Sequence, residues 1–183
     1  MKVTVIGNGI SRIPIPLNKI PGVTVGCNEV YKEMTPNYLC AVDFVMLYEL
    51  HESNYKGPVC FRFKSLNLHG LKPKRDWFCP NFMDHNSSGH AAIELAAGLD
   101  ATEIDILGFD CQVGRVYGEH TPPSSFQRWV DTLIHQADKY PIRRIVGENS
   151  LDIPEIKNTI SVQDYINELE RKLHYGDISS GKK

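Results

Sequence analysis

Val3-Thr4-Val5-Ile6-Gly7-Asn8-Gly9, residues 3 to 9 of the chain, is the stretch that decides the fold. Its first four residues are all β-branched, which favours a buried β-strand. A glycine on each side of Asn8 then predicts a tight turn directly after that strand. The stretch therefore indicates the first strand of a sheet, with a glycine turn at its carboxyl end.

The same arrangement recurs twice further along the chain. Residues 23–25 form a β-branched run followed closely by Asn28, and residues 38–42 form an apolar run that ends at Asp43. Ligands of open α/β sheets bind outside the carboxyl ends of the strands, near the point where the strand order reverses. We therefore expect Asn8, Asn28 and Asp43 to share one rim of the sheet.

Further strand-like and helix-like segments complete the pattern. Strands are expected at 59–63, 77–79, 104–107 and 144–146. Helices are expected from Ser87 or Ser88 to Leu99, from Ser124 or Ser125 through Ala137, and from Ser161 through Leu169. Each of these segments begins with a serine that can act as N-cap and continues with apolar residues at helical spacing. The alternation predicts an α/β, Rossmann-like single domain whose mostly parallel sheet is flanked by helices.

The composition agrees with this fold class. The chain has 183 residues, of which 42% are apolar and 23% charged, the usual balance of one globular domain. Twenty Lys and Arg against 22 Asp and Glu give a formal charge of −2, so we expect no nucleic-acid partner. No apolar run reaches the roughly 20 residues that span a bilayer, and no signal peptide precedes the first strand. We therefore expect a cytoplasmic protein without a membrane span.

Domain boundaries follow from the same pattern. Residues 1–175 are expected to form one nucleotide-binding domain. The stretch 109–123 lacks a hydrophobic period and is expected to be a functional, lid-like loop. Residues 176–183 are polar and are expected to form a flexible tail.

The cysteines and histidines do not form a metal-binding pattern. No H-E-x-x-H or D-x-D motif occurs, so we expect neither a metal ion nor a cofactor. The five cysteines are odd in number and include no C-x-x-C pair, which favours buried, reduced thiols over a disulfide framework or a zinc site. They are Cys27, Cys40, Cys60, Cys79 and Cys111.

Nucleotide motifs limit the reaction classes. The Gly7-Asn8-Gly9 turn can bring backbone N–H groups close to a phosphate. A dinucleotide fingerprint needs a third glycine where this chain has Arg12, and we identify no acidic residue at the usual distance on a second strand end, which disfavours nicotinamide chemistry. The absence of a P-loop motif excludes P-loop nucleotidases. The helix start at Ser87-Ser88-Gly89 can bind an anion, or it is simply a polar capped turn.

The loop after the strand at 104–107 carries candidate catalytic groups. Asp110 can orient a ligand hydroxyl, or it caps the following turn. Further along, Arg115 suits a phosphate charge, Tyr117 a leaving phosphate oxygen, and His120 proton abstraction from a hydroxyl. The alternative interpretation is a solvated loop.

An ordered set of segments resembles a known family. They read V-T-V-I-G-N-G-I-S at 3–11, V-G-C-N-E-V-Y at 25–31, Y-L-C-A-V-D at 38–43, S-S-G-H-A-A-I-E-L-A-A-G-L at 87–99, I-D-I-L-G-F-D at 104–110 and R-I-V-G-E-N-S-L at 144–151. In this order they resemble the bacterial lipooligosaccharide sialyltransferases, in a shortened form. They also resemble the related pterin pyrophosphokinase-like and flagellin-modification accessory proteins.

The resemblance implies a set of binding residues. It assigns the nucleotide and its phosphate to Gly7, Asn8, Gly9 and Asn28. It assigns contacts with the nucleotide or the sugar to Ser87, Ser88 and Gly89, and it adds the strand end at Gly108 and Asp110. Tyr117 would take the place of a phosphate-binding tyrosine. The chain departs from the family at Ile10, where members have proline, and at Gln112, where they have tyrosine, and the family's catalytic histidine lies farther along than His120.

These observations together predict a metal-independent, glycosyltransferase-like enzyme. It would bind a sugar nucleotide, most simply a CMP-sugar, at the carboxyl edge of the sheet and transfer the sugar to a hydroxyl acceptor. His120 would take the acceptor proton, and Tyr117 with Asn28 would stabilise the leaving phosphate. The alternatives are magnesium-dependent phosphoryl or pyrophosphoryl transfer, and a nucleotide- or metabolite-binding protein without turnover. We also expect a homo-oligomer, since a domain of this size often completes its site with a neighbouring subunit.

Overall fold

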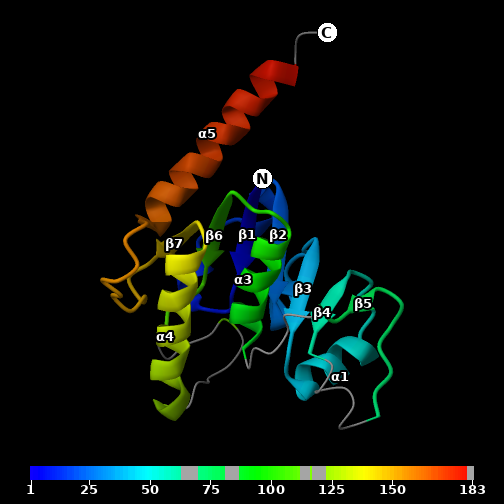
Figure 1. Cartoon of the computed structure of the whole chain (residues 1–183). Helices are drawn as coiled ribbons and strands as arrows, with labels where there is room; N and C mark the ends of the chain where they lie inside the picture. Colours follow the sequence, from blue (N-terminus) through cyan, green and yellow to red (C-terminus); the bar gives the residue numbers. More distant parts are fainter. Residues whose placement is uncertain (63–69, 81–86, 112–115, 117–122, 181–183) are drawn as a thin grey trace.

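The computed structural model describes residues 1–62, 70–80, 87–111, 116 and 123–180. Within them, eight strands form one sheet in which every neighbouring pair is parallel, in the order β5-β4-β3-β2-β1-β6-β7-β8 (Figure 1). The strands are β1 (Lys2–Ile6), β2 (Val23–Cys27), β3 (Tyr38–Ala41), β4 (Val59–Phe61), β5 (Trp77–Phe78), β6 (Glu103–Leu107), β7 (Ile142–Val146) and β8 (Thr159–Ser161). The predicted α/β, Rossmann-like fold is confirmed.

The strand order reverses between β1 and β6. The chain builds outward from β1 to β5 on one side and then returns to place β6 on the other side of β1. β1 and β6 are in register from Lys2 opposite Glu103 to Ile6 opposite Leu107, so both strands end at the same level. This reversal is where open α/β sheets bind their ligands.

Helices cover both faces of the sheet. They are α1 (Phe44–Glu52), α3 (Ser88–Gly98), α4 (Pro123–Lys139) and α5 (Val162–Ser180), with short 3-10 turns η1 (Ile10–Arg12), η2 (Leu17–Lys19) and η3 (Asn28–Lys32). α3 and α4 stand side by side over one face, where Ile93 and Leu133 pack in one cluster with Val5 and Ile106 (Figure 1). The opposite face carries α5 and α1 in separate clusters. In Figure 1, α5 reaches beyond the end of the sheet at which the N-terminus lies.

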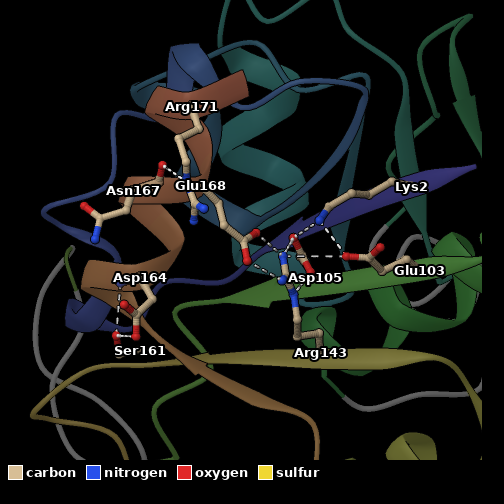
Figure 2. Close-up of polar contacts among 9 residues, drawn as sticks. All are labelled: Lys2, Glu103, Asp105, Arg143, Ser161, Asp164, Asn167, Glu168 and Arg171. Atoms are coloured by element: carbon tan, nitrogen blue, oxygen red, sulfur yellow. Dashed lines mark hydrogen bonds and ion pairs between the residues drawn. The ribbon is translucent and has the colours of Figure 1, made fainter. Parts of the chain in front are cut away.

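A partly buried ion-pair cluster fastens α5 to the sheet (Figure 2). Arg143 of β7 donates two hydrogen bonds to Asp105 of β6, at 2.8 and 3.0 Å, and two to Glu168 of α5, at 3.0 and 3.1 Å. The Nζ of Lys2 lies 2.6 Å from Asp105, whose side chain is fully buried. The hydrogen bonds that Arg143 donates to Asp105, against the opposing effect of burial, raise the pKa of Arg143. Since these charges neutralise one another, the cluster can lie between helix and sheet.

Several element boundaries differ from the prediction. α1 and β8 were not expected: α1 is apolar on most sides, and β8 has only three residues. In the described part, the strand expected at 59–63 ends at Phe61, β5 is one residue shorter than expected, and α3 ends at Gly98. α5 continues to Ser180, so the backbone is helical past residue 175, where the tail was expected to begin.

The expected state of the cysteines is confirmed. All five thiols are free, and four of them are buried, with Cys79 partly exposed. In the described residues no helix is both long enough and apolar enough to span a membrane.

Candidate functional site

The glycine turn after β1 is held against the end of β6. The N–H of Gly7 donates to the carbonyl of Leu107 at 2.8 Å, and the N–H of Gly9 donates to the carbonyl of Gly108 at 2.9 Å. A Cβ atom on either Gly7 or Gly9 would lie only 2.6 Å from the Gly108 oxygen. Gly108 itself has a φ of +66°, which glycine adopts without strain. The predicted tight turn is therefore present, and its glycines are required by close backbone contact.

Asp110 fastens this turn to the loop that follows β7. Its Oδ2 accepts the N–H of Ser11 at 2.9 Å, and its Oδ1 accepts the hydroxyl of Ser150 at 2.9 Å. The Ser150 hydroxyl in turn accepts the N–H of Gly147 at 3.0 Å. Because both carboxylate oxygens are engaged within the chain, the geometry gives Asp110 a structural part in addition to the ligand contact predicted for it. Sequence reasoning gave Ser11 and Ser150 no role, although both lie in the segments at 3–11 and 144–151 that carry the family resemblance.

The side chain of Arg144, in β7, hydrogen-bonds to the segment that follows β6. Its guanidinium is almost fully buried and donates to the carbonyls of Phe109, at 3.0 and 3.2 Å, and Leu151, at 2.8 Å. Burial lowers the pKa of Arg144, while the nearby Cys111 and Asp110 oppose that effect. The carbonyl groups at the end of β6 are therefore held in place by a buried charge.

Asn8, between the two glycines, has a buried acceptor without a partner. Its Nδ2 donates to Oε2 of Glu29 at 3.0 Å, and its backbone carbonyl accepts the N–H of Val116 at 2.9 Å. Its Oδ1 accepts no hydrogen bond from the part of the chain that the structure describes, although the side chain is only 9% exposed. An unpaired buried acceptor costs about 1–3 kcal/mol. A ligand donor at this position would remove that cost.

Asn28 links the ends of β2 and β3 to the start of α3. It has a φ of +50°, a conformation that asparagine adopts more readily than most residues. Its Oδ1 accepts the hydroxyl hydrogen of Ser88 at 2.7 Å, and the Ser88 oxygen accepts the N–H of Val42 at 3.1 Å. One serine therefore joins three elements at the carboxyl edge.

The first turn of α3 has no side-chain cap from its N-cap residue. Ser87 occupies the N-cap position as predicted, but its hydroxyl makes no cap hydrogen bond and instead accepts the indole N–H of Trp129 at 2.8 Å. The Trp129 ring packs against His90 and Phe109, with centroids 4.7 and 5.7 Å apart. A Cβ on Gly89 would lie 3.0 Å from the Phe109 ring. The N-terminus of α3, which carries partial positive charge, is thus positioned by α4.

Asp43 lies at the same edge of the sheet. It is the N-cap residue of α1, its side chain is exposed and makes no cap hydrogen bond, and it directly follows Val42, which is bonded to Ser88. β1, β2 and β3 are neighbouring parallel strands, so Asn8, Asn28 and Asp43 all follow strand ends on one rim.

Glu29 is the residue that sequence reasoning overlooked. We identified no acidic residue at the end of the second strand, and this was wrong: Glu29 follows β2 closely and accepts the Asn8 amide. It lies about 20 residues after the glycine turn, the spacing of the ribose-binding acid in dinucleotide folds. The sequence Cys27-Asn28-Glu29 already placed an acidic residue at this spacing. It was overlooked because Asn28, which has a positive φ, lies between the strand and the acid.

The predicted catalytic residues Tyr117 and His120, and also Arg115, lie outside the described residues. Their roles stay predictions. Of the expected loop at 109–123, the described residues are 109–111, 116 and 123. Among them, Val116 contacts the glycine turn through its hydrogen bond to Asn8.

Comparisons with known proteins show a shared fold. No protein-family model matches the sequence, and no curated protein matches it. Among solved structures, the chain is similar to the sialyltransferase CST-II in complex with a trisaccharide acceptor and CMP, with a TM-score of 0.51 and 14% identity over 79% of this chain and 80% of that one. Another structure of CstII, from Campylobacter jejuni and in complex with CMP, gives a TM-score of 0.48 and 15% identity over 79% of this chain and 78% of that one. A protein from Lactobacillus plantarum gives a TM-score of 0.42 and 19% identity. The match covers 79% of this chain and 59% of that protein.

Proposed function

We propose that this protein binds a sugar nucleotide at the carboxyl edge formed by β1, β2 and the start of α3, and transfers the sugar to a hydroxyl acceptor. The observation that carries the proposal is Asn8, a buried amide whose Oδ1 has no partner among the described residues, in the glycine turn where the strand order reverses. A buried polar group at that place in an open α/β sheet is well suited to contact a ligand.

The N-terminus of α3 supplies the other half of the site, which would take the phosphate. The N–H groups of its first turn carry partial positive charge, and Ser87 leaves them without a side-chain cap. Ser88 and Asn28 fix this helix end relative to β2 and β3. The phosphate would therefore meet donors that are already in position, which is the condition for stabilising a leaving group.

The shared fold supports a nucleotide as the ligand. CST-II, which has this fold at a TM-score of 0.51, was solved with CMP and a trisaccharide acceptor. CMP is therefore the first nucleotide to test, and a CMP-sugar the first donor.

The catalytic step of the proposal is a direct displacement. The acceptor oxygen forms a bond to the anomeric carbon while the bond from that carbon to the phosphate oxygen breaks. The acceptor proton passes to His120, and Tyr117 donates a hydrogen bond to the departing phosphate. A general base of this kind contributes roughly 10²- to 10⁴-fold to the rate.

A thermal-shift series tests binding. CMP, UMP, AMP and GMP are each added with and without magnesium. A ligand at 100 times its dissociation constant stabilises by about 2.7 kcal/mol, which raises the Tm of a chain of this size by about 5–11 °C. CMP should give this rise without magnesium, and no shift with any nucleotide would contradict the proposal.

A matched pair of variants locates the site. Asn28→Gly removes the side chain that contacts Ser88 while glycine still tolerates the positive φ. Asn54→Gly makes the same change at an exposed position of the loop after α1. Asn28→Gly should reduce the CMP-induced shift, whereas Asn54→Gly should leave it unchanged.

Turnover separates the proposal from its alternatives. Release of CMP from a CMP-sugar is followed with and without EDTA. Release of CMP that persists in EDTA supports metal-independent transfer of the sugar, and release that is lost on chelation contradicts the metal independence of the proposal. The phosphoryl-transfer alternative instead predicts magnesium-dependent transfer of a phosphoryl or pyrophosphoryl group from a nucleoside triphosphate. CMP binding without release would indicate a binding protein.

A further inference from the structure

Glu29 and Asn8 form a pair of hydrogen-bonded groups at the ends of two adjacent strands. Asn8 follows β1, Glu29 follows β2, and the Asn8 Nδ2 donates to Glu29 Oε2 at 3.0 Å. Asn8 is nine-tenths buried and Glu29 is partly buried. The two side chains therefore form one unit beside the glycine turn.

The hydrogen bond between Asn8 and Glu29 determines which of their polar atoms remain available to a ligand. An ionised carboxylate only accepts hydrogen bonds, so the Asn8 amide must turn its Nδ2 toward Glu29. The Asn8 Oδ1 then points elsewhere, and it has no partner in the described part of the chain. Glu29 Oε1 likewise accepts no hydrogen bond from a described residue.

Two acceptors on one unit favour a ligand that brings two donors. A phosphate oxygen is itself an acceptor and is unfavourable beside a carboxylate. A vicinal pair of hydroxyl groups fits, since each hydroxyl can donate one hydrogen bond. In a nucleotide, the ribose 2′- and 3′-hydroxyls are such a pair.

We infer that Glu29 and Asn8 bind the ribose hydroxyls of the ligand, so that the site selects ribonucleotides over 2′-deoxyribonucleotides. This inference rests on the proposed function, because it assigns the sugar end of the same nucleotide. The phosphate end then lies toward the N-terminus of α3, where donors replace acceptors. The two ends of the site thus have opposite hydrogen-bonding character.

The first test uses the unmodified protein and compares CMP with 2′-deoxy-CMP by calorimetric titration. Loss of one hydrogen bond to a charged group predicts an affinity about 10- to 100-fold lower for the deoxynucleotide. Equal affinities for the two nucleotides would overturn the inference while leaving the proposed function intact. If CMP does not bind but another of the four ribonucleotides does, the same comparison is made with that base.

The second test uses Glu29→Gln, with Glu155→Gln as the matched control. The glutamine can still accept the Asn8 amide through its oxygen, but it presents a donor where Glu29 has its second acceptor. Glu29→Gln should lower the ratio of the two affinities, because a neutral amide replaces the charged acceptor, and Glu155→Gln, on an exposed loop, should keep the ratio of the unmodified protein. Because the readout is a ratio, a general loss of affinity cannot imitate it.

The remaining outcomes are also decisive. A Glu29→Gln variant that binds CMP and 2′-deoxy-CMP with an unchanged ratio refutes the role of Glu29. A variant that loses affinity for a CMP-sugar but not for CMP would show that these acceptors contact the transferred sugar, which also overturns the inference. If none of the nucleotides binds to the unmodified protein, the proposed function fails, and the inference fails with it.

Discussion

Replacing Gly9 with alanine should strongly destabilise the protein, because the turn after β1 has no space for a Cβ atom. The added carbon would lie 2.5 Å from Oδ2 of Asp110, 2.6 Å from the backbone oxygen of Gly108 and 2.7 Å from Cγ of Asp110. Ordinary contacts between carbon and oxygen are about 3.3 Å or longer. Two parts of the chain must therefore move.

Neither neighbour can move without losing contacts. The Gly108 oxygen accepts the N–H of Gly9 itself, and Asp110 is held by Ser11 and Ser150. Overpacking of this kind costs about 1–3 kcal/mol, and a lost hydrogen bond to a charged group costs about 1.5–3 kcal/mol. Together they predict a loss of about 2.5–6 kcal/mol, which lowers the Tm of a chain of this size by about 5–24 °C.

Urea unfolding and thermal unfolding, both followed by circular dichroism, measure the loss. Gly98→Ala is the matched control, since Gly98 is an exposed residue in the last turn of α3 and should tolerate alanine or gain up to about 1 kcal/mol. In the double variant Gly9→Ala/Asp110→Ala, the Gly108 oxygen still obstructs the Cβ, so stability should not recover. A Gly9→Ala protein within 1 kcal/mol of the unmodified one would refute this reasoning about the turn.

Three further predictions concern an ion-pair residue, two buried cysteines and the proposed general base. Arg143→Met should cost about 1.5–3 kcal/mol in urea unfolding, because the buried carboxylate of Asp105 loses two hydrogen bonds and keeps its ion pair with Lys2. Burial raises the pKa of the Cys27 and Cys111 thiols to about 12, so the folded state keeps them protonated where the unfolded state ionises. The free energy of unfolding should therefore fall as the pH rises from about 9 toward 12, by about 1.4 kcal/mol per pH unit for each thiol, and replacing both cysteines with valine should flatten that slope. His120→Ala should lower the rate of CMP release by roughly 10²- to 10⁴-fold with CMP affinity unchanged, and unaltered turnover would remove His120 from the mechanism.

The sheet could be predicted because most of its strands are short and mainly apolar, and a small or polar residue follows several of them. Val3 to Ile6 and Ile104 to Leu107 show this pattern, and they are the central pair of the sheet. α1 was missed because Phe44 to Glu52 contains apolar residues on several sides, so no helical stripe stands out. β8 was missed because its only signal is three residues, paired with β7 at the edge of the sheet.

The sequence predicted where the candidate residues lie along the edge of the sheet, but not which residues they contact. Asn8, Asn28 and Asp43 could be placed at one edge from the strand ends, since parallel strands bring their carboxyl ends together. Their partners could not be placed, because a hydrogen bond such as that from Ser88 to Asn28 joins residues far apart in the sequence. The contact between Glu29 and Asn8 likewise joins residues from two different strand ends.

The engagement of Asp110 bears on where a general base can come from. Both of its oxygens are held by Ser11 and Ser150, so taking a proton there would weaken the contacts that fasten the glycine turn. The proposed transfer therefore needs a base other than Asp110. The chain returns to the turn at Val116, whose N–H donates to the Asn8 carbonyl, and Tyr117 and His120 follow in the sequence. In the proposed mechanism His120 has the part of the base, and it is therefore the first residue to replace.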